Sequence, residues 1–133
     1  MEHIFIGGAF FTTKKEDTDI FPFIVDIIKE NLTNLKVIQP TDIENYRNKI
    51  EMQNPTITLQ QLNKAMVDYD LEMIRTSKLF LADVTNKSLG LGIELGIAKQ
   101  NNVATELVAK KDANISNMVF GAFPDCKIKY YSN

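Results

Sequence analysis

Residues 79–100 read LFLADVTNKSLGLGIELGIAKQ, and this stretch decides the fold. Its apolar beginning, residues 79–82, has the composition of a short buried strand, which Asp83 closes. Residues 88–100 then have the spacing of a helix with a glycine-rich first turn. A strand followed directly by a helix is the repeating unit of a parallel α/β sheet. We therefore expect a fold built from such units.

The rest of the chain continues this alternation of apolar runs and helical periods. Four further strands are expected, at residues 3–8, 36–39, 103–109 and 127–131. Three further helices are expected, from the Asp19 cap to about residue 32, at 59–76 and at 113–120. The polar residues 41–55 have no firm period, so they predict a loop with room for a short helix.

Five strands alternating with helices predict an α/β fold, a flavodoxin-like or Rossmann-like sandwich with a five-stranded parallel sheet covered on both faces. The chain has 133 residues, of which 44% are hydrophobic. This length and this apolar fraction suit one hydrophobic core, so residues 1–133 are expected to form a single domain.

Composition argues against several classes of function. Fifteen basic and seventeen acidic residues give a net charge of −2, and no stretch concentrates Lys or Arg, so a polynucleotide partner is not expected. With Cys126 as the one cysteine and His3 as the one histidine, neither an intrachain disulfide nor a zinc site is expected. The chain shows no signal sequence and no apolar run near the roughly 20 residues that span a bilayer. We expect a cytoplasmic protein without a membrane segment.

The predicted topology indicates where a ligand should bind. In open parallel sheets, ligands bind beyond the carboxyl ends of the strands, near the topological switch point. Three polar or glycine-rich segments fall at such ends, namely residues 7–11, residues 83–94 and the loop before Ser116.

The segment that begins at Ser88 is the most informative of the three. Gly90 and Gly92 would let the backbone approach a ligand closely, and the amides of the first helical turn would form an anion site, to which Ser88 adds a hydroxyl. Glu94 lies one turn further along, where we expect the positive helix end to keep its carboxylate ionised, as an attacking group requires. The alternative interpretation is that Ser88 is only a helix cap and Glu94 a solvated helix residue.

Asp70 is a second candidate for chemistry. It lies four residues after Met66 and three before Met73, at the border of the buried face of its helix, where a carboxyl group can have a raised pKa and act as an acid. Cleavage of an N-glycosidic bond needs stabilisation of the departing base and a carboxylate near the cationic sugar. Asp70 and Glu94 supply one candidate for each task, and neither task calls for a metal or an organic cofactor.

Four motifs in matching order resemble the nucleoside 2-deoxyribosyltransferase superfamily. They are IFIGGAFFT at 4–12, Asp70-Leu71, GLGIELG at 90–96 and ISNM at 115–118. Residues 82–85 (ADVT) and 88–96 (SLGLGIELG) are most similar to the branch of 2'-deoxynucleoside 5'-phosphate N-hydrolases.

The resemblance implies roles for individual residues. Glu94 would be the nucleophile, and Asp70 would contact the base or assist its departure. Ser88 and Ser116 would hold the 5' end of the nucleotide, with Ser116 offered by a neighbouring subunit. The chain would then form a homodimer or a higher homo-oligomer with a shared active site. The expected substrate-binding residues are Phe5, Gly7, Gly8, Phe10, Phe11, Ser88, Gly90, Gly92, Ser116 and Asn117.

The two serines favour a phosphorylated substrate. Transferases that act on free nucleosides carry Asp and Asn at these positions, and a carboxylate at position 88 would repel a phosphate. The chain departs from the family pattern at Phe5, where a tyrosine is usual, so the choice between ribose and deoxyribose stays open. It also has Phe10 and Phe11 where the hydrolase branch tends to have an arginine; this pair would stack on the base or pack in the core.

The sequence leaves three hypotheses about function. The first is cleavage of the N-glycosidic bond of a nucleoside or deoxynucleoside 5'-monophosphate, with release of free base and sugar 5-phosphate. The second is a nucleoside 2-deoxyribosyltransferase that exchanges bases on deoxyribose. The third is a nucleotide-binding sensor module without catalysis, because a fold alone does not establish activity.

Overall fold

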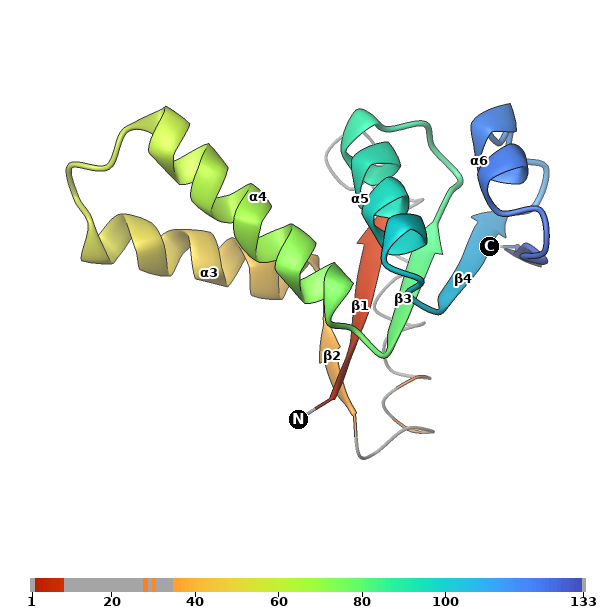
Figure 1. The fold of residues 1–133 in the computed structure, drawn as a ribbon, viewed down its shortest axis with the longest axis horizontal. Coiled ribbons are helices and arrows are strands. Elements are labelled where there is room, and N and C mark those ends of the chain that lie inside the picture. The colour runs from red at the N-terminus through yellow and green to blue at the C-terminus, as the bar shows by residue number, and fades with distance from the viewer. Residues whose placement is uncertain (1, 9–27, 29, 31–34, 133) are drawn as a thin grey trace.

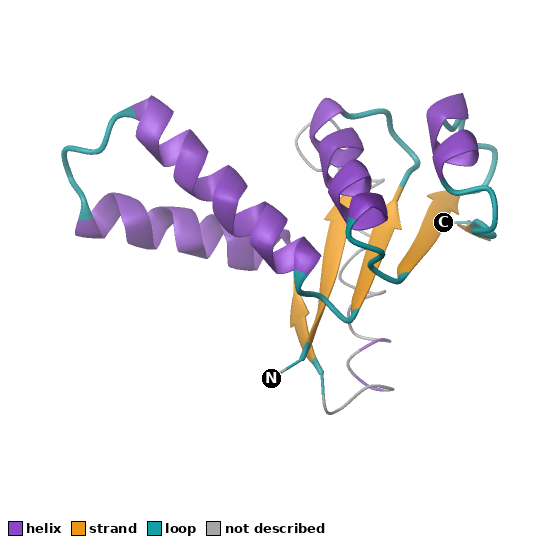
Figure 2. Ribbon diagram, in the orientation of Figure 1, coloured by secondary structure: helices purple, strands orange, loops and turns teal. Residues whose placement is uncertain are grey.

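Five parallel strands form the centre of the structure, a computed structural model that describes residues 2–8, 28, 30 and 35–132 (Figures 1 and 2). The strands are β1 (His3–Gly8), β2 (Lys36–Ile38), β3 (Leu79–Asp83), β4 (Thr105–Lys110) and β5 (Lys129–Tyr131). Their order across the sheet is β2-β1-β3-β4-β5, and every neighbouring pair is parallel. The predicted five-stranded parallel sheet is confirmed, and the strand order is the flavodoxin-like one.

Alternate residues of each strand point to opposite faces of the sheet, and each face carries a cluster of buried apolar side chains. On one face, Phe5 of β1 lies opposite Phe80 of β3, and both belong to the larger apolar cluster. On the other face, the neighbouring pair Ile6 and Leu81 packs with Val37 of β2. The helix expected between Asp19 and residue 32 lies largely outside the described residues; of it, residues 28 and 30 are helical, and Ile28 packs against this second cluster.

The described helices are α3 (Pro40–Gln53), α4 (Leu59–Arg75), α5 (Leu89–Gln100) and α6 (Asn117–Ala122). α4 and α5 contact one another, and α5 also contacts β1 and β3. Figures 1 and 2 show α5 in front of the sheet and α6 near the end of β4, whereas α3 and α4 form a hairpin that projects beyond the β2 edge. In the described part of the chain, no helix has the length and apolar character needed to cross a bilayer.

The prediction of a loop with room for a short helix at residues 41–55 is wrong, because nearly all of this segment forms the helix α3. Pro40 occupies its first turn, and the side chains of Gln39 and Asp42 form a reciprocal capping box. α3 has no buried residue. It therefore lacks the apolar stripe on which recognition of a helix from periodicity depends. The helix expected at 113–120 also begins later, since Ser116 is the cap of α6.

A buried polar network joins the carboxyl ends of β3 and β4 to the edge strand β5. Asp83 is 5% exposed and accepts hydrogen bonds from the Tyr131 hydroxyl and, at 2.9 Å, from the amide of Thr85. The Thr85 hydroxyl lies 3.3 Å from the Tyr131 hydroxyl and accepts from the amide of Lys110 at 2.8 Å. A buried carboxylate is stable in a fold only when such donors surround it.

Removal of the Tyr131 hydroxyl should therefore destabilise the fold. We expect Tyr131→Phe to lower the free energy of unfolding by about 1–3 kcal/mol, because Asp83 would lose a donor while it stays buried. Urea denaturation followed by circular dichroism measures this change. Tyr130→Phe is the matched control, since the neighbouring Tyr130 side chain is exposed and its loss should cost less than about 0.5 kcal/mol. Equal effects of the two substitutions would contradict the structural role of the network.

Candidate active site

A cavity of about 290 Å³ lies at the carboxyl end of β1, where the strand order changes direction. Ligand sites of open α/β sheets occur at this switch point, here between β1 and β3. β1 contributes Phe5, Gly7 and Gly8 to its wall. The helices α3, α4 and α5 supply the remaining lining residues, which are Pro40, Ile43, Glu44, Arg47, Met66, Val67, Asp70, Ser88, Gly90, Leu91 and Glu94.

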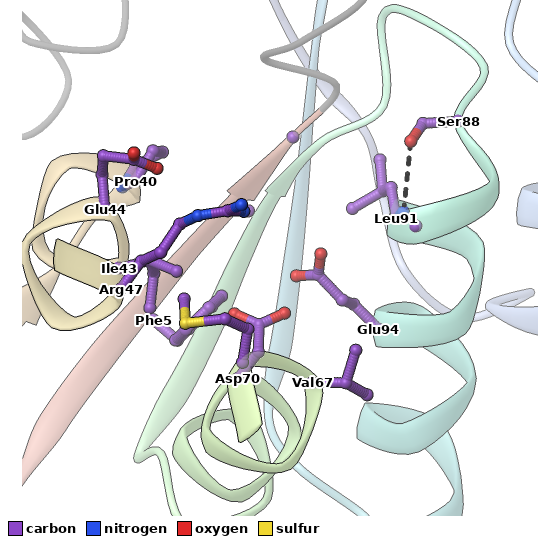
Figure 3. Close-up of a pocket in the computed structure, with 14 residues that line it drawn as sticks. Phe5, Pro40, Ile43, Glu44, Arg47, Val67, Asp70, Ser88, Leu91 and Glu94 are labelled. Carbon is purple, nitrogen blue, oxygen red and sulfur yellow. Dashed lines mark hydrogen bonds between the residues drawn. The ribbon is translucent and has the colours of Figure 1, made fainter. Parts of the chain in front are cut away.

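The structure brings Asp70 and Glu94 together in this cavity (Figure 3). Asp70 comes from α4 and Glu94 from α5, two helices that pack against each other. Both carboxyl groups point into the same space, and both side chains are partly buried. The interpretation of Glu94 as a solvated helix residue is thereby excluded.

Burial changes the protonation of both groups. It raises the pKa of Asp70 to about 6, as the sequence led us to expect of a carboxyl group at the edge of a buried helix face. Burial and, second, the negative charge of Asp70 raise the pKa of Glu94 to about 8. The expectation that the helix end would keep Glu94 ionised is therefore wrong. Glu94 is the sixth residue of α5, beyond the first turn in which the field of the helix is strong, so desolvation dominates.

Gly7 provides the space for the Glu94 carboxyl group. A methyl group at position 7 would lie 3.0 Å from Phe80 Cζ and 3.1 Å from Glu94 Oε2. Both separations are tighter than ordinary van der Waals contact, so any side chain at this position would displace the carboxyl group or the ring. Gly7, which was expected to bind the substrate, thus provides the space beside β1 that the Glu94 side chain occupies.

Ser88 lies at the start of α5, on the side of the cavity opposite α3 (Figure 3). Its hydroxyl oxygen accepts a hydrogen bond from the amide of Leu91 at 3.3 Å, which makes Ser88 the cap of the helix. The same hydroxyl can still donate its own hydrogen to a ligand. Gly90 follows in the first turn and lines the cavity as well. Capping and ligand binding are therefore compatible roles for Ser88.

Four cavity residues from α3 were missed because this segment was expected to be a loop. Pro40, Ile43, Glu44 and Arg47 line the cavity from one face of the helix. Their spacing of three, one and three residues is that of a single helix face. This spacing, together with the capping box, is the signal that could have found them.

Several expected site residues lie elsewhere. Ser116 and Gly92 line a second cavity of about 560 Å³ between α5 and α6, which shares Ser88 and Leu91 with the first. Asn117, the first residue of α6, is exposed and is not among the described lining residues of either cavity. Phe10 and Phe11 lie outside the described residues.

Phe5 combines two positions, because it lines the cavity and belongs to the core. Its ring is 1% exposed and stacks on Phe80 with centroids 5.7 Å apart. Among the described residues, no group of three His, Cys, Asp or Glu side chains is placed to hold a metal ion. The polar groups that the described residues bring to the cavity wall are three carboxyl groups, one hydroxyl, helical amides and one guanidinium.

Solved structures share this fold, including the two that follow. The CMP N-glycosidase BcmB of Clostridium botulinum superposes with a TM-score of 0.56 and 19% identity, with 99% of this chain and 88% of that chain covered. A conserved protein from Enterococcus faecalis V583 superposes with a TM-score of 0.65 and 15% identity, with coverages of 100% and 92%. Models of known families and curated protein sequences give no match. The chain thus shares its fold, over nearly its full length, with these two proteins.

The raised pKa of Glu94 predicts how stability depends on pH. Between its ordinary pKa of 4.5 and about 8, the folded protein binds a proton at Glu94 that the unfolded chain releases. The contribution of Glu94 to stability is therefore fully present at low pH and is lost as the pH rises from about 4.5 through about 8. We expect Glu94→Gln, which is neutral at every pH, to unfold with a free energy larger than wild type by on the order of 2–4 kcal/mol at pH 9 and to match it near pH 4. Denaturant titrations from pH 4 to pH 9 measure this, and a wild-type stability that increases over this range would contradict the assignment.

Proposed function

We propose that this chain belongs to the nucleoside 2-deoxyribosyltransferase superfamily and cleaves the N-glycosidic bond of a nucleoside 5'-monophosphate, releasing free base and sugar 5-phosphate. The observation that carries the proposal is the meeting of Asp70 and Glu94 in one cavity at the switch point of the sheet. The fold shared with a CMP N-glycosidase supports the same conclusion and makes CMP the first substrate to test.

The pair of carboxyl groups holds the number of protons that this reaction needs. With pKa values of about 6 for Asp70 and about 8 for Glu94, the pair carries one proton between those pH values. The reaction uses one carboxylate as a nucleophile and one carboxyl group as an acid. The productive arrangement has the proton on Asp70 and the charge on Glu94, and the cationic character that develops at the sugar favours it.

The steps follow from this arrangement. A carboxylate oxygen of Glu94 forms a bond to C1' while the bond from C1' to the base nitrogen breaks, and Asp70 delivers its proton to the departing base. A water molecule then attacks C1', gives a proton to the Asp70 carboxylate and releases Glu94 from the sugar. The products are the free base and the sugar 5-phosphate, and both carboxyl groups return to their initial state.

The cavity orients a nucleotide in one direction. The first-turn amides of α5 and the hydroxyl of Ser88 form a site for an anion, which suits the 5'-phosphate. Glu94 lies one turn further along the same helix, where C1' would be placed. The base then extends toward the wall made by α3 and α4, where Ile43, Met66 and Val67 offer apolar contacts.

A panel of substrates tests the proposal. Base release from nucleoside 5'-monophosphates, CMP first, and from the corresponding free nucleosides is followed by chromatography, with added adenine to reveal base exchange. We expect release from at least one monophosphate and loss of at least roughly 10³-fold in turnover for Glu94→Ala. Glu72→Ala is the matched control, because Glu72 lies on the outer face of α4, paired with Arg75, and should keep wild-type activity.

The results of the panel separate the three hypotheses. Exchange with adenine instead of hydrolysis would favour the transferase, and tight binding without turnover would favour a sensor module. Wild-type activity in Glu94→Ala would refute the nucleophile assignment.

We further propose that the active site is shared between two copies of the chain, with Ser116 donated by the partner. Ser116 does not line the cavity that holds Glu94 but lies in the neighbouring one. Leu89 and Met118 line that second cavity and are exposed in the single chain, as are Ile93 and Phe120 of the same two helices. A self-complementary contact of this surface would cover these side chains and bring a second hydroxyl toward the phosphate end.

A mixing experiment tests this sharing. Glu94→Ala and Ser116→Asp should each be nearly inactive, the first for lack of a nucleophile and the second because its carboxylate repels the phosphate. Mixed dimers contain one intact site, with Glu94 from one copy and Ser116 from the other. An equal mixture of the two variants should therefore recover about a quarter of wild-type activity. A mixture no more active than its components, or a monomer in sedimentation velocity, would contradict the shared site.

A further inference from the structure

We propose that Arg47 stabilises the departing base by donating hydrogen bonds to the acceptor atom beside the glycosidic nitrogen. This inference rests on the proposed function and assigns a role to a residue of α3. The acceptor is O2 in a pyrimidine and N3 in a purine, so the proposal concerns bases that carry such an atom.

The position of Arg47 is the first support. Its side chain extends from α3 into the cavity, toward the space in front of Glu94 (Figure 3). Its Nε donates to Glu51 Oε1 at 3.1 Å, a contact between residues one helical turn apart that anchors the side chain at its base. The planar guanidinium keeps two terminal nitrogens that can donate to a ligand.

The charge of the cavity is the second support. Among the described lining residues, Arg47 carries the one positive charge, whereas Glu44, Asp70 and Glu94 are acidic. The Arg47 side chain is 37% exposed where it lines the cavity, and a guanidinium placed beside a reacting centre stabilises negative charge that develops there. The nucleotide carries negative charge at two places during this reaction. The charge on the phosphate is permanent, whereas the charge on the base appears as the bond breaks.

The direction of the bound nucleotide decides between these two places. The phosphate is assigned to Ser88 and the first turn of α5, on the far side of Glu94 from α3. Arg47 stands instead on the α3–α4 wall, with Ile43 and Met66, where the base is assigned. A charged donor among apolar neighbours suits a ring that is held by its faces and polarised at its edge.

The chemistry of the step gives Arg47 its effect. When the bond between C1' and nitrogen breaks, its electron pair passes to the base and is shared with the adjacent acceptor atom. The guanidinium donates to that atom, and the proton from Asp70 neutralises the base as it leaves. The interaction is stronger in the transition state than in the bound substrate, so it should raise kcat more than it lowers KM.

Two substrates with different leaving groups test the inference. One is CMP, or whichever monophosphate the panel identifies, and the other is 4-nitrophenyl β-D-ribofuranoside 5-phosphate, whose nitrophenolate leaves without stabilisation by the protein. We expect Arg47→Met to lower kcat for the nucleotide by roughly 10²–10³-fold, as removal of a preorganised donor does, and kcat for the nitrophenyl substrate by less than about fivefold. Arg47→Lys should restore part of the loss on the nucleotide.

Arg75→Met is the control, because Arg75 is an exposed arginine of α4 that, like Arg47, pairs with a glutamate of its own helix but does not line the cavity. It should keep wild-type kinetics on both substrates. Since α3 has no buried residue, Arg47→Met should fold, and thermal unfolding checks this against the control.

Each other result would overturn the inference. Equal losses on both substrates would assign Arg47 to the phosphate or to the shape of the cavity. A rise in KM with unchanged kcat would mean that Arg47 contributes to binding alone. Absence of turnover on either substrate by the wild-type protein would refute the proposed function and this inference with it, whereas the first two outcomes would refute this inference only.

Discussion

The close approach of the Glu94 carboxyl group to β1 at Gly7 is the constraint on which the site depends, because a methyl group at position 7 would lie 3.1 Å from Glu94 Oε2. The strand supports the carboxyl group only because position 7 has no side chain, and the ring of Phe80 closes the space from below. Phe80 in turn stacks on Phe5 across the β1–β3 pair. The packing of Phe5 and Phe80 therefore helps to determine the position of the Glu94 carboxyl group. A substitution at Phe80 would move this group.

The same close approach explains the protonation of the site. The Glu94 carboxyl group lies close to β1 and is largely shielded from solvent, and Asp70 lies beside it. Burial and the charge of Asp70 therefore disfavour its ionised form and raise its pKa. The fold tolerates this because the cost is incurred at one position, while the Asp83–Tyr131 network and the two apolar clusters stabilise the sheet elsewhere. A functional site that is less stable than its surroundings is a common arrangement in enzymes.

The sequence was informative where apolar periodicity records burial. The strands around Phe5 and Phe80 and the helix from Leu89 were predictable because alternate or helically spaced residues face the core. The helix α3 was not, since none of its residues is buried and its start is marked only by Pro40 and the capping box of Gln39 and Asp42. For the same reason, Arg47 was not predicted to be a residue of the site.

The juxtaposition of Asp70 and Glu94 could be anticipated from motifs, but their protonation could not. Local sequence shows the helix that carries Glu94 and suggests a favourable field from its end. The burial that outweighs this field is produced by α4, β1 and the packing of Gly7, which come together only in three dimensions. Electrostatic properties of a site depend on such long-range contacts more than on the residues around it in the chain.

The helix α3 lines the cavity but carries neither of the two carboxyl groups to which the proposed reaction assigns chemistry. On the surface of α3 that faces the cavity, Ile43 packs against the core, whereas Glu44 and Arg47 are not part of it. Glu44 and Arg47 can therefore change during evolution, or in a directed library, with little loss of folding stability. This arrangement makes the outer wall the natural place for related proteins to diverge in the ring they accept while the bond they break stays the same.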